Sequence, residues 1–172
     1  RDDVESRGLG DVYKRQAIHM GEGPLVDQPL TVEGKVWKVT CVSVGNPHCV
    51  IFLNEISKDI VCRIGKNSEN ASYFPERVNT QIMRVIDRQN IEIEIYERGA
   101  GYTLASGSSG CAAEAAAYKQ GLTDSKMYVK MPGGTLEIEI LDDWTVLMTG
   151  DVGFVGTMQL GNTLVEQLRA LE

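Results

Sequence analysis

The chain has 172 residues, with 17 Lys and Arg against 24 Asp and Glu, and its formal net charge is −7. This length suffices for one domain, or slightly more, with a buried core, and the acidic balance offers no basic surface for nucleic acid. Four cysteines without Cys-x-x-Cys spacing and two histidines argue against a metal site. No apolar stretch approaches the roughly 20 residues of a membrane helix, so we expect a cytoplasmic protein that does not contact a membrane.

Strand patterns dominate the chain and predict an α+β domain. Ile91, Ile93 and Ile95 alternate with polar residues, which is the period-two signature of a half-buried strand. Residues 54–72 are polar and predict a surface helix or loop. The expected strands, in chain order, span residues 35–42, 49–53, 78–86, 91–96, 127–131, 136–141, 146–149 and 154–159.

Small residues predict a central helix over residues 112–117, where the alanines are strong helix formers. Ser108 or Ser109 can cap its start, and Gly121 stands where a left-handed residue often ends a helix. The segment carries little polarity except at Glu114, so we expect a buried helix with strands wrapped closely around it.

The start of this helix follows a glycine-rich turn and predicts an anion site. The backbone N–H groups of residues 107–110 should be unpaired, and the helix dipole adds positive potential there, so a carboxylate or a phosphate would fit. Taken alone, the Gly-Ser-Ser-Gly run is more simply a capped helix after a tight turn. The charged pair Glu97-Arg98 just before the turn favours a site for a zwitterion.

Two more segments place polar side chains at strand ends. Gly45-Asn46-Pro47-His48 predicts a turn between two strands, and Asn79 opens the strand that follows Arg77. Taken alone, Asn46 is an ordinary turn residue, His48 a hydrogen-bonded structural histidine, and Asn79 a strand-edge residue.

Together and in this order, the motifs resemble those of the diaminopimelate epimerase family, amino-acid epimerases that use two facing cysteines and no pyridoxal cofactor. The resemblance covers residues 17–159, which correspond to the second half of the family's length. It implies a mixed β-sheet barrel wrapped around a central buried helix. The matching segments are Ile18-His19-Met20-Gly21, Gly45-Asn46-Pro47-His48, Arg77-Val78-Asn79, Glu97-Arg98-Gly99-Ala100-Gly101-Tyr102-Thr103-Leu104-Ala105, Met131-Pro132-Gly133-Gly134-Thr135-Leu136 and Met148-Thr149-Gly150.

The chain departs from the family where the family reads Ala-Cys-Gly-Thr-Gly. Here the sequence is Ala105-Ser106-Gly107-Ser108-Ser109, so Ser106 occupies the position of the second catalytic cysteine. A thiol titrates near pH ~8.5, and lower at a helix N-terminus, whereas a serine hydroxyl stays protonated unless a base activates it. Cys111 cannot substitute, because it lies one helical turn further on.

The resemblance implies removal of the Cα proton by one catalytic group and its return from the opposite face by another. The implied reaction interconverts the LL and meso forms of diaminopimelate, in lysine and peptidoglycan precursor biosynthesis, and needs no cofactor and no metal. An arginine suits a substrate with two carboxylates, because it binds a carboxylate at two points. The implied catalytic residues are Ser106, His48 and Glu97, and the implied substrate-binding residues are Asn46, Asn79, Glu97, Arg98, Gly107 and Ser108.

We expect three segments. Residues 1–16 are polar, lack an initiator methionine and fall outside the resemblance, so they are interpreted as a non-native leader or, alternatively, a disordered native linker. Residues 17–160 form the epimerase-like C-terminal domain. Residues 161–172 form a short helix whose apolar stripe would dock on the absent N-terminal domain, which carries the other catalytic residue. The fragment alone should be inactive, and the expected partners include a small amino acid and, optionally, a second copy.

Two other function classes remain open. A one-base lyase or isomerase on the same scaffold is supported by Ser106, because one strong base can remove a proton without returning it from the other face. An inactive, carboxylate-binding fragment is supported by the missing half of the site. A hydrolase is less favoured, since the serines lack the Gly-x-Ser-x-Gly pattern.

Overall fold

The computed structural model describes residues 13–19, 25–32 and 34–170, which divide into two units, residues 13–151 and a second unit that contains residues 152–170. The elements are β1 (Tyr13–His19), β2 (Leu25–Val32), β3 (Lys35–Ser43), β4 (Pro47–Phe52), α1 (Lys58–Glu69), β5 (Asn79–Asp87), β6 (Asn90–Glu97), β7 (Gly101–Thr103), α2 (Gly107–Lys119), β8 (Lys126–Met131), β9 (Gly134–Ile140), β10 (Thr145–Asp151) and α3 (Asn162–Arg169).

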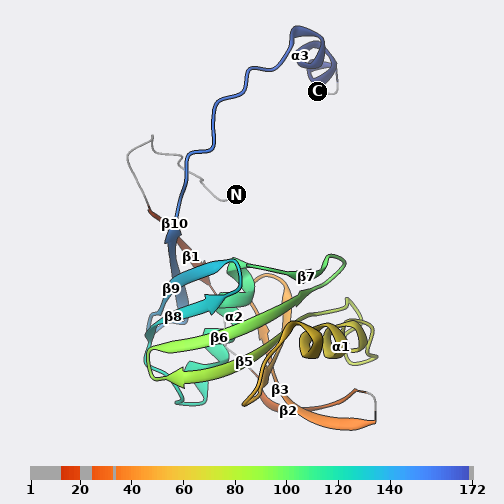
Figure 1. Cartoon of the computed structure of the whole chain (residues 1–172), viewed down its shortest axis with the longest axis vertical. Helices are drawn as coiled ribbons and strands as arrows, with labels where there is room; N and C mark the ends of the chain where they lie inside the picture. Colours follow the sequence, from red (N-terminus) through yellow and green to blue (C-terminus); the bar gives the residue numbers. More distant parts are fainter. Residues whose placement is uncertain (1–12, 20–24, 33, 171–172) are drawn as a thin grey trace. The chain divides into compact units, whose positions relative to one another are not determined.

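One mixed sheet organises the larger unit (Figure 1). The strands follow the order β1-β10-β9-β8-β6-β5-β4-β3-β2, and β7 pairs with β6 beside this path. The pairs β4–β5 and β6–β8 are parallel, and all other pairs in the described ranges are antiparallel. The expected α+β class is therefore confirmed.

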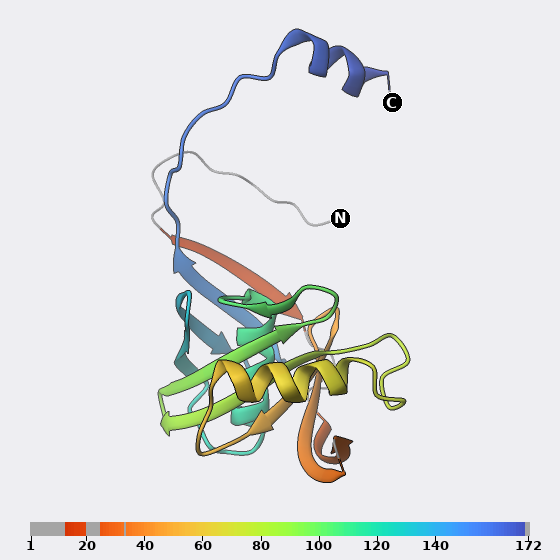
Figure 2. The same ribbon diagram turned by 45° about the vertical axis from the view of Figure 1, so that its right-hand side comes forward.

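The two parallel pairs place α1 and α2 on opposite faces of the sheet, as Figure 2 shows. The connection β4-α1-β5 and the connection β6-α2-β8 advance in the same direction across the sheet. Crossovers between parallel strands are right-handed, but β5 and β6 run antiparallel. The strands β6 and β8 therefore run opposite to β4 and β5, while both connections move toward the β1 edge of the sheet. A right-handed crossover then places α2 on the face opposite α1.

On the α1 face, an amphipathic helix covers alternate residues of the central strands. Its buried side chains Val61 and Ile64 pack with Ile51 of β4 and Ile82 of β5, while its other side is exposed. The segment for which we expected a helix or a loop thus contains a helix, and Ser57 begins it by accepting a hydrogen bond from the Ile60 N–H.

On the α2 face, the helix is buried almost all round. It contacts strands β3 to β6 and β8 to β10. The predicted helix over residues 112–117 is confirmed and is longer, and Gly121 follows it at a φ of 70°. The expected cap at Ser108 or Ser109 is wrong, because the helix begins earlier, with Ser106 at its N-cap. The side chains without solvent exposure are Ser109, Cys111, Ala112, Ala113, Glu114, Ala115, Ala116 and Ala117.

The barrel implied by the resemblance is not closed. Closure requires a hydrogen-bonded ladder between the two edge strands, and within the described ranges β1 and β2 each pair on one side only. These strands are nevertheless joined by residues 20–24, so the adjoining strand ends lie within about 20 Å of each other by chain length alone. The sheet thus curls around α2, but in the described ranges no ladder joins its edge strands β1 and β2.

Other expectations changed at the chain ends. Residues 13–16, which we assigned to the leader, form the first part of β1, while residues 1–12 lie outside the described part. The strand expected over residues 154–159 is wrong, because residues 152–161 have no regular structure and no ladder partner, and Phe154 and Val155 are exposed. The C-terminal helix is confirmed as α3.

Candidate functional site

The register of β4 and β5 brings two of the motifs side by side. His48, at the start of β4, lies opposite Asn79, the first residue of β5, in a parallel pair. Parallel pairing aligns strand ends with the same sense, so the Gly-Asn-Pro-His turn and the Arg-Val-Asn segment meet at one edge of the sheet.

Asn79 joins these two motifs to a third. Its amide nitrogen donates to the Pro47 carbonyl at 2.9 Å, and its amide oxygen accepts from the Arg98 N–H at 3.0 Å. The side chain is 95% buried, so water cannot easily replace either bond. Asn79 therefore acts as a brace: it holds Arg98, which directly follows β6, beside the turn before His48.

His48 is buried, with 1% exposure, and both ring nitrogens contact amides. Nδ1 lies 3.3 Å from Oε1 of Gln81 and Nε2 lies 3.0 Å from Oδ1 of Asn46. Burial lowers the pKa of His48 to about 4 because it disfavours the charged ring, and the positive charge of Arg98 acts in the same direction, while the bond to Gln81 opposes it. The ring is therefore neutral at neutral pH.

The first turn of α2 carries three serines. Ser106 Oγ accepts from the Ser109 N–H at 3.4 Å and lies 3.4 Å from Ser108 Oγ. The Ser109 and Gly110 N–H groups are thus bonded within the turn, whereas in the described residues those of Gly107 and Ser108 have no partner. Two N–H groups, rather than the four expected, remain for an anion.

Glu97 is the last residue of β6, and Arg98 begins the loop to β7; both are half-buried. The guanidinium of Arg98 donates to the Glu76 carbonyl at 2.8 Å. Across the described part of the chain, no hydrogen bond or ion pair engages the Glu97 side chain, and no hydrogen bond connects Ser106 to Glu97 or His48. The structure therefore gathers Asn46, His48, Asn79 and Arg98 into one bonded group, while Ser106 is not bonded to a base.

A carboxylate that sequence reasoning missed supports this loop. Glu69, at the end of α1 and 8% exposed, accepts from the Gly99 N–H at 2.8 Å and from Arg77 at 3.1 Å. Arg77 has a φ of 61°, which is unusual for a residue with a side chain. Its ion pair with Glu69 helps to hold that conformation beside the strand that begins at Asn79.

Two further residues were missed, Gln81 and Ser109. The amide nitrogen of Gln81 donates to Ser109 Oγ at 3.0 Å, and neither side chain is exposed. Gln81 could have been noticed, since it lies two positions after Asn79, on the same face of the strand, and directly before the apolar residues Ile82 and Met83. Ser109 gave none that separates it from its neighbouring serines.

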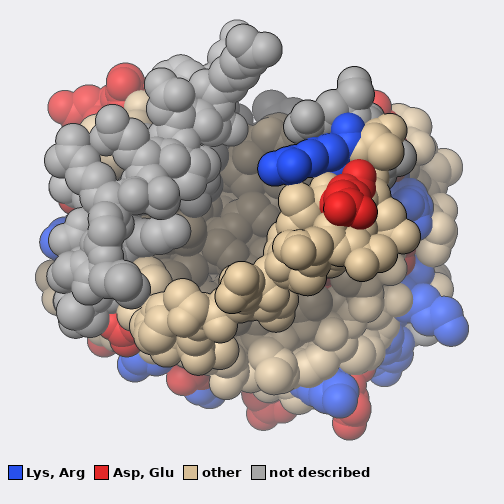
Figure 3. Space-filling model, turned by 90° about the horizontal axis from the view of Figure 1, so that it is seen from above, with Lys and Arg blue, Asp and Glu red and all other residues tan. Residues whose placement is uncertain are grey.

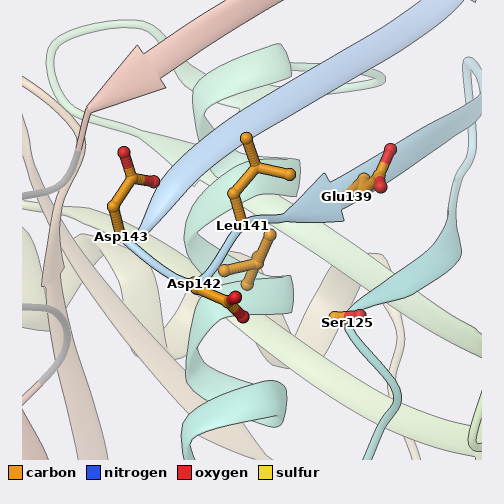
Figure 4. Close-up of a pocket in the computed structure, with 6 residues that line it drawn as sticks. Ser125, Glu139, Leu141, Asp142 and Asp143 are labelled. Carbon is orange, nitrogen blue, oxygen red and sulfur yellow. The ribbon is translucent and has the colours of Figure 1, made fainter.

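The described residues also line a depression away from these motifs. A shallow depression lies at the turn between β9 and β10, near the C-terminal end of α2, and Figure 4 shows that Glu139, Asp142 and Asp143 do not point to a common centre. Within the described ranges, no group of three or more His, Cys, Asp and Glu side chains could hold a metal. In the view of Figure 3, acidic and basic side chains are interspersed along the lower rim.

Two solved structures share the fold. A predicted epimerase from Pseudomonas aeruginosa gives a TM-score of 0.56 at 12% identity and covers 84% of this chain and 59% of that chain. A putative phenazine biosynthesis PhzC/PhzF protein from Clostridium difficile gives 0.55 at 18% identity, with 87% and 59% coverage. At such low identity the likeness concerns the fold alone, which is the α+β class described above.

The family model described as diaminopimelate epimerase matches residues 40–155. The chain belongs to the diaminopimelate epimerase family. Diaminopimelate epimerase 2 from Nostoc sp. is 47% identical over 128 residues, which are 74% of this chain and 45% of the relative. Diaminopimelate epimerase from Picosynechococcus sp. is 42% identical over 141 residues, or 80% and 50%. The chain therefore spans about half the length of these relatives.

In the described part of the chain, no helix has the length and apolar character needed to cross a membrane. The four cysteines are free thiols.

Proposed function

We propose that this chain supplies one half of the active site of an amino-acid epimerase that interconverts the LL and meso forms of diaminopimelate. The observation that carries the proposal is the hydrogen bonding of Asn79, which draws three separate family motifs to the sheet edge beside Arg98. In this proposal a domain outside this chain brings the opposing base, and α3 docks on that domain. Free thiols are consistent with a cytoplasmic setting.

The reacting carboxylate of the substrate would bind the N–H groups of Gly107 and Ser108. Negative charge grows on this carboxylate as the Cα proton leaves, and the start of α2 would stabilise that charge through its dipole and its two N–H donors. Arg98 would bind the distal carboxylate, with Asn46 and Glu97 on the ammonium side. Asn79 would act mainly as the brace between these groups.

Ser106 favours a second candidate function, a one-base lyase or isomerase on the same scaffold. Its hydroxyl is engaged as the N-cap of α2, and in the described residues it is not hydrogen-bonded to His48 or Glu97. Without a base the hydroxyl stays protonated at neutral pH. A single strong base in the other domain would then remove the Cα proton, while its return from the Ser106 side would be slow. An inactive carboxylate-binding fragment is the third outcome.

The test uses a hybrid in which residues 17–172 replace the second half of the Nostoc enzyme. In deuterated water we expect deuterium to enter Cα of one diaminopimelate isomer faster than the other isomer forms. Loss of water or ammonia from the substrate would support the lyase instead. If a folded hybrid shows neither deuterium exchange at Cα nor loss of water or ammonia, the epimerase and the lyase are both contradicted. The inactive carboxylate-binding fragment then remains. The 172-residue chain alone should not interconvert the isomers.

Restoring the thiol tests the position of Ser106. A positioned acid or base typically contributes about 10²–10⁴-fold, so Ser106→Cys should raise the rate of inversion at least about tenfold in the hybrid. Ser57→Cys, at the N-cap of the other long helix, is the matched control and should leave the rate unchanged. An equal rate in the original and the Ser106→Cys hybrid would remove Ser106 from the role of second base.

The role of Arg98 can be tested with two substrates. Arg98→Lys keeps the charge but loses the planar fork that meets a carboxylate at two points. We expect kcat/KM to fall much more for a diacid than for a monoacid amino acid, whereas Arg88→Lys, on the exposed ion pair with Asp124, should change neither. Equal losses for both substrates would argue against distal recognition by Arg98.

A further inference from the structure

Four polar side chains form a continuous path from α2 to the turn before β4. Ser109 Oγ is 3.0 Å from the Gln81 amide nitrogen, Gln81 Oε1 is 3.3 Å from His48 Nδ1, and His48 Nε2 is 3.0 Å from the Asn46 amide. Ser109, Gln81 and His48 are at most 1% exposed. Asn46 is half-buried at the site edge, so the path leads from the protein interior to the place of the substrate.

The buried end of this path determines which ring nitrogen carries the proton. In the structure the amide nitrogen of Gln81 donates to Ser109 and the amide oxygen faces His48, and an amide oxygen can only accept. A neutral imidazole has one N–H, so that N–H lies on Nδ1. Nε2 then has no proton and can only accept a hydrogen bond.

We propose that Ser109 and Gln81 are positioning residues that hold His48 as the Nδ1–H tautomer and thereby turn the amide oxygen of Asn46 toward the substrate. A bare Nε2 repels the Oδ1 that now lies 3.0 Å away, so the Asn46 amide makes a half-turn and donates its NH₂ group to Nε2. Asn46 is half-buried in a turn and its side chain has one partner among the described residues, His48, whereas the Gln81 amide is bonded at both its nitrogen and its oxygen.

The consequence concerns substrate recognition, and in this respect the inference rests on the proposed function. With its NH₂ group bonded to His48, Asn46 offers an acceptor oxygen to the substrate. An acceptor suits an ammonium group, while the opposite orientation would offer a donor suited to a carboxylate. The path would thus favour an amino acid whose ammonium group lies beside Asn46.

The tautomer can be measured without activity, by ¹⁵N NMR of the 172-residue chain with labelled histidine at pH 7. The chain has two histidines, and His19→Gln assigns the remaining signals to His48. We expect the Nδ1 shift of a protonated nitrogen and the Nε2 shift of an unprotonated one. An Nε2–H tautomer in the unmodified chain would overturn the proposal, even if the hybrid is an active epimerase.

Variants then test Ser109. Ser109→Ala should lower the ratio of Nδ1–H to Nε2–H tautomer about fivefold or more, which is the effect of losing one hydrogen bond. Ser68→Ala removes another buried serine hydroxyl, which donates to the Ile64 carbonyl within α1, and should leave the ratio unchanged. An unchanged ratio in Ser109→Ala, or an equal change in Ser68→Ala, would contradict a specific role. If Ser109→Ala does not fold, Gln81→Met gives the same test.

Discussion

The two faces of the sheet are covered by helices that differ in how much of their surface is buried. On one face, α1 presents a stripe of Val61 and Ile64 to the strands and leaves its other side in water. On the other face, α2 is rich in alanines, and the curled sheet buries them on every side. The same strands serve both helices, because alternate residues of β4 and β5 point to opposite faces.

The difference shows where the molecule tolerates change. A helix that contacts a sheet along one stripe can vary on its exposed side, whereas an enclosed helix has no free side. The enclosed helix is also the one whose first turn carries Ser106 and Ser108. The candidate site is thus attached to the element with the least room to move, which suits groups that need fixed positions.

The largest expected effect comes from Glu114, the acidic residue of the enclosed helix. Both carboxyl oxygens lack a partner in the described part of the chain. Burial, reinforced by the negative charge of Glu139, raises its pKa from 4.5 to about 9. The unfolded chain therefore releases this proton above about pH 4.5 while the folded chain keeps it, so stability is lost as the pH rises from 4.5 toward 9.

Glu114→Met should remove this loss and stabilise the chain at pH 7 by about 3 kcal/mol. Urea unfolding at pH 5 and pH 8 would measure it, and the variant should lose less stability than the unmodified chain between these values. Asp59→Asn, which removes an exposed carboxyl from α1, should leave the pH dependence in place. An unchanged pH dependence in Glu114→Met would mean that Glu114 is ionised in the folded chain.

The second largest effect is expected when a larger side chain is placed on each helix, because only α2 is enclosed. Ala116 is 0% exposed, so Ala116→Leu should cost about 2 kcal/mol, as extra methylenes do in a filled core. Lys66→Leu, on the exposed side of α1, should change the free energy of unfolding by less than about 0.5 kcal/mol. Similar costs for both would show that α2 is not tightly enclosed.

Removing the helix caps should have smaller and nearly equal effects. Ser57 and Ser106 accept from an N–H three residues on, at 3.3 and 3.4 Å. Ser57→Ala and Ser106→Ala should therefore each lower the free energy of unfolding by about 1 kcal/mol. A much larger loss for Ser106→Ala, measured by thermal unfolding, would show that this serine contributes to packing as well as capping.

The smallest effect is expected at the exposed strand surface. Arg84 on β5 pairs with Glu92 on β6 in water, and such pairs typically contribute about 0–1 kcal/mol. Arg84→Ala should lower the melting temperature only slightly, and less in high salt. A loss comparable to that of a cap would show that this pair orders the two strands.

Much of the central fold was predictable from local pattern. The alternation around Ile93 predicted β6, and the alanine run predicted α2. Neither β1 nor β2 was predicted, since residues 13–19 are largely polar and Pro29 lies within β2. Proline is tolerated there because β2 is an edge strand, and edge position is a property of the whole sheet that no local pattern reveals.

The candidate site was predictable only as separate motifs. The sequence identified Asn79 and His48, but their register depends on the parallel pairing of β4 and β5. The contact between Gln81 and Ser109 depends on how α2 packs against the sheet. Glu69 lies in a polar stretch where many side chains look alike, and only the fold shows that it accepts a hydrogen bond from Gly99, in the loop after Arg98.

The order of strands also bears on the time course of folding. From β2 to β6, neighbours in the sheet are neighbours in the chain, so they can pair early with little loss of chain entropy. The ladder between β1 and β10 joins Tyr13 to Asp151 and requires nearly the whole chain. Val146 of β10 belongs to the core around α2. We therefore expect the burial of α2 to be completed last, when β1 pairs with β10. Until then the Glu114 carboxyl should stay hydrated.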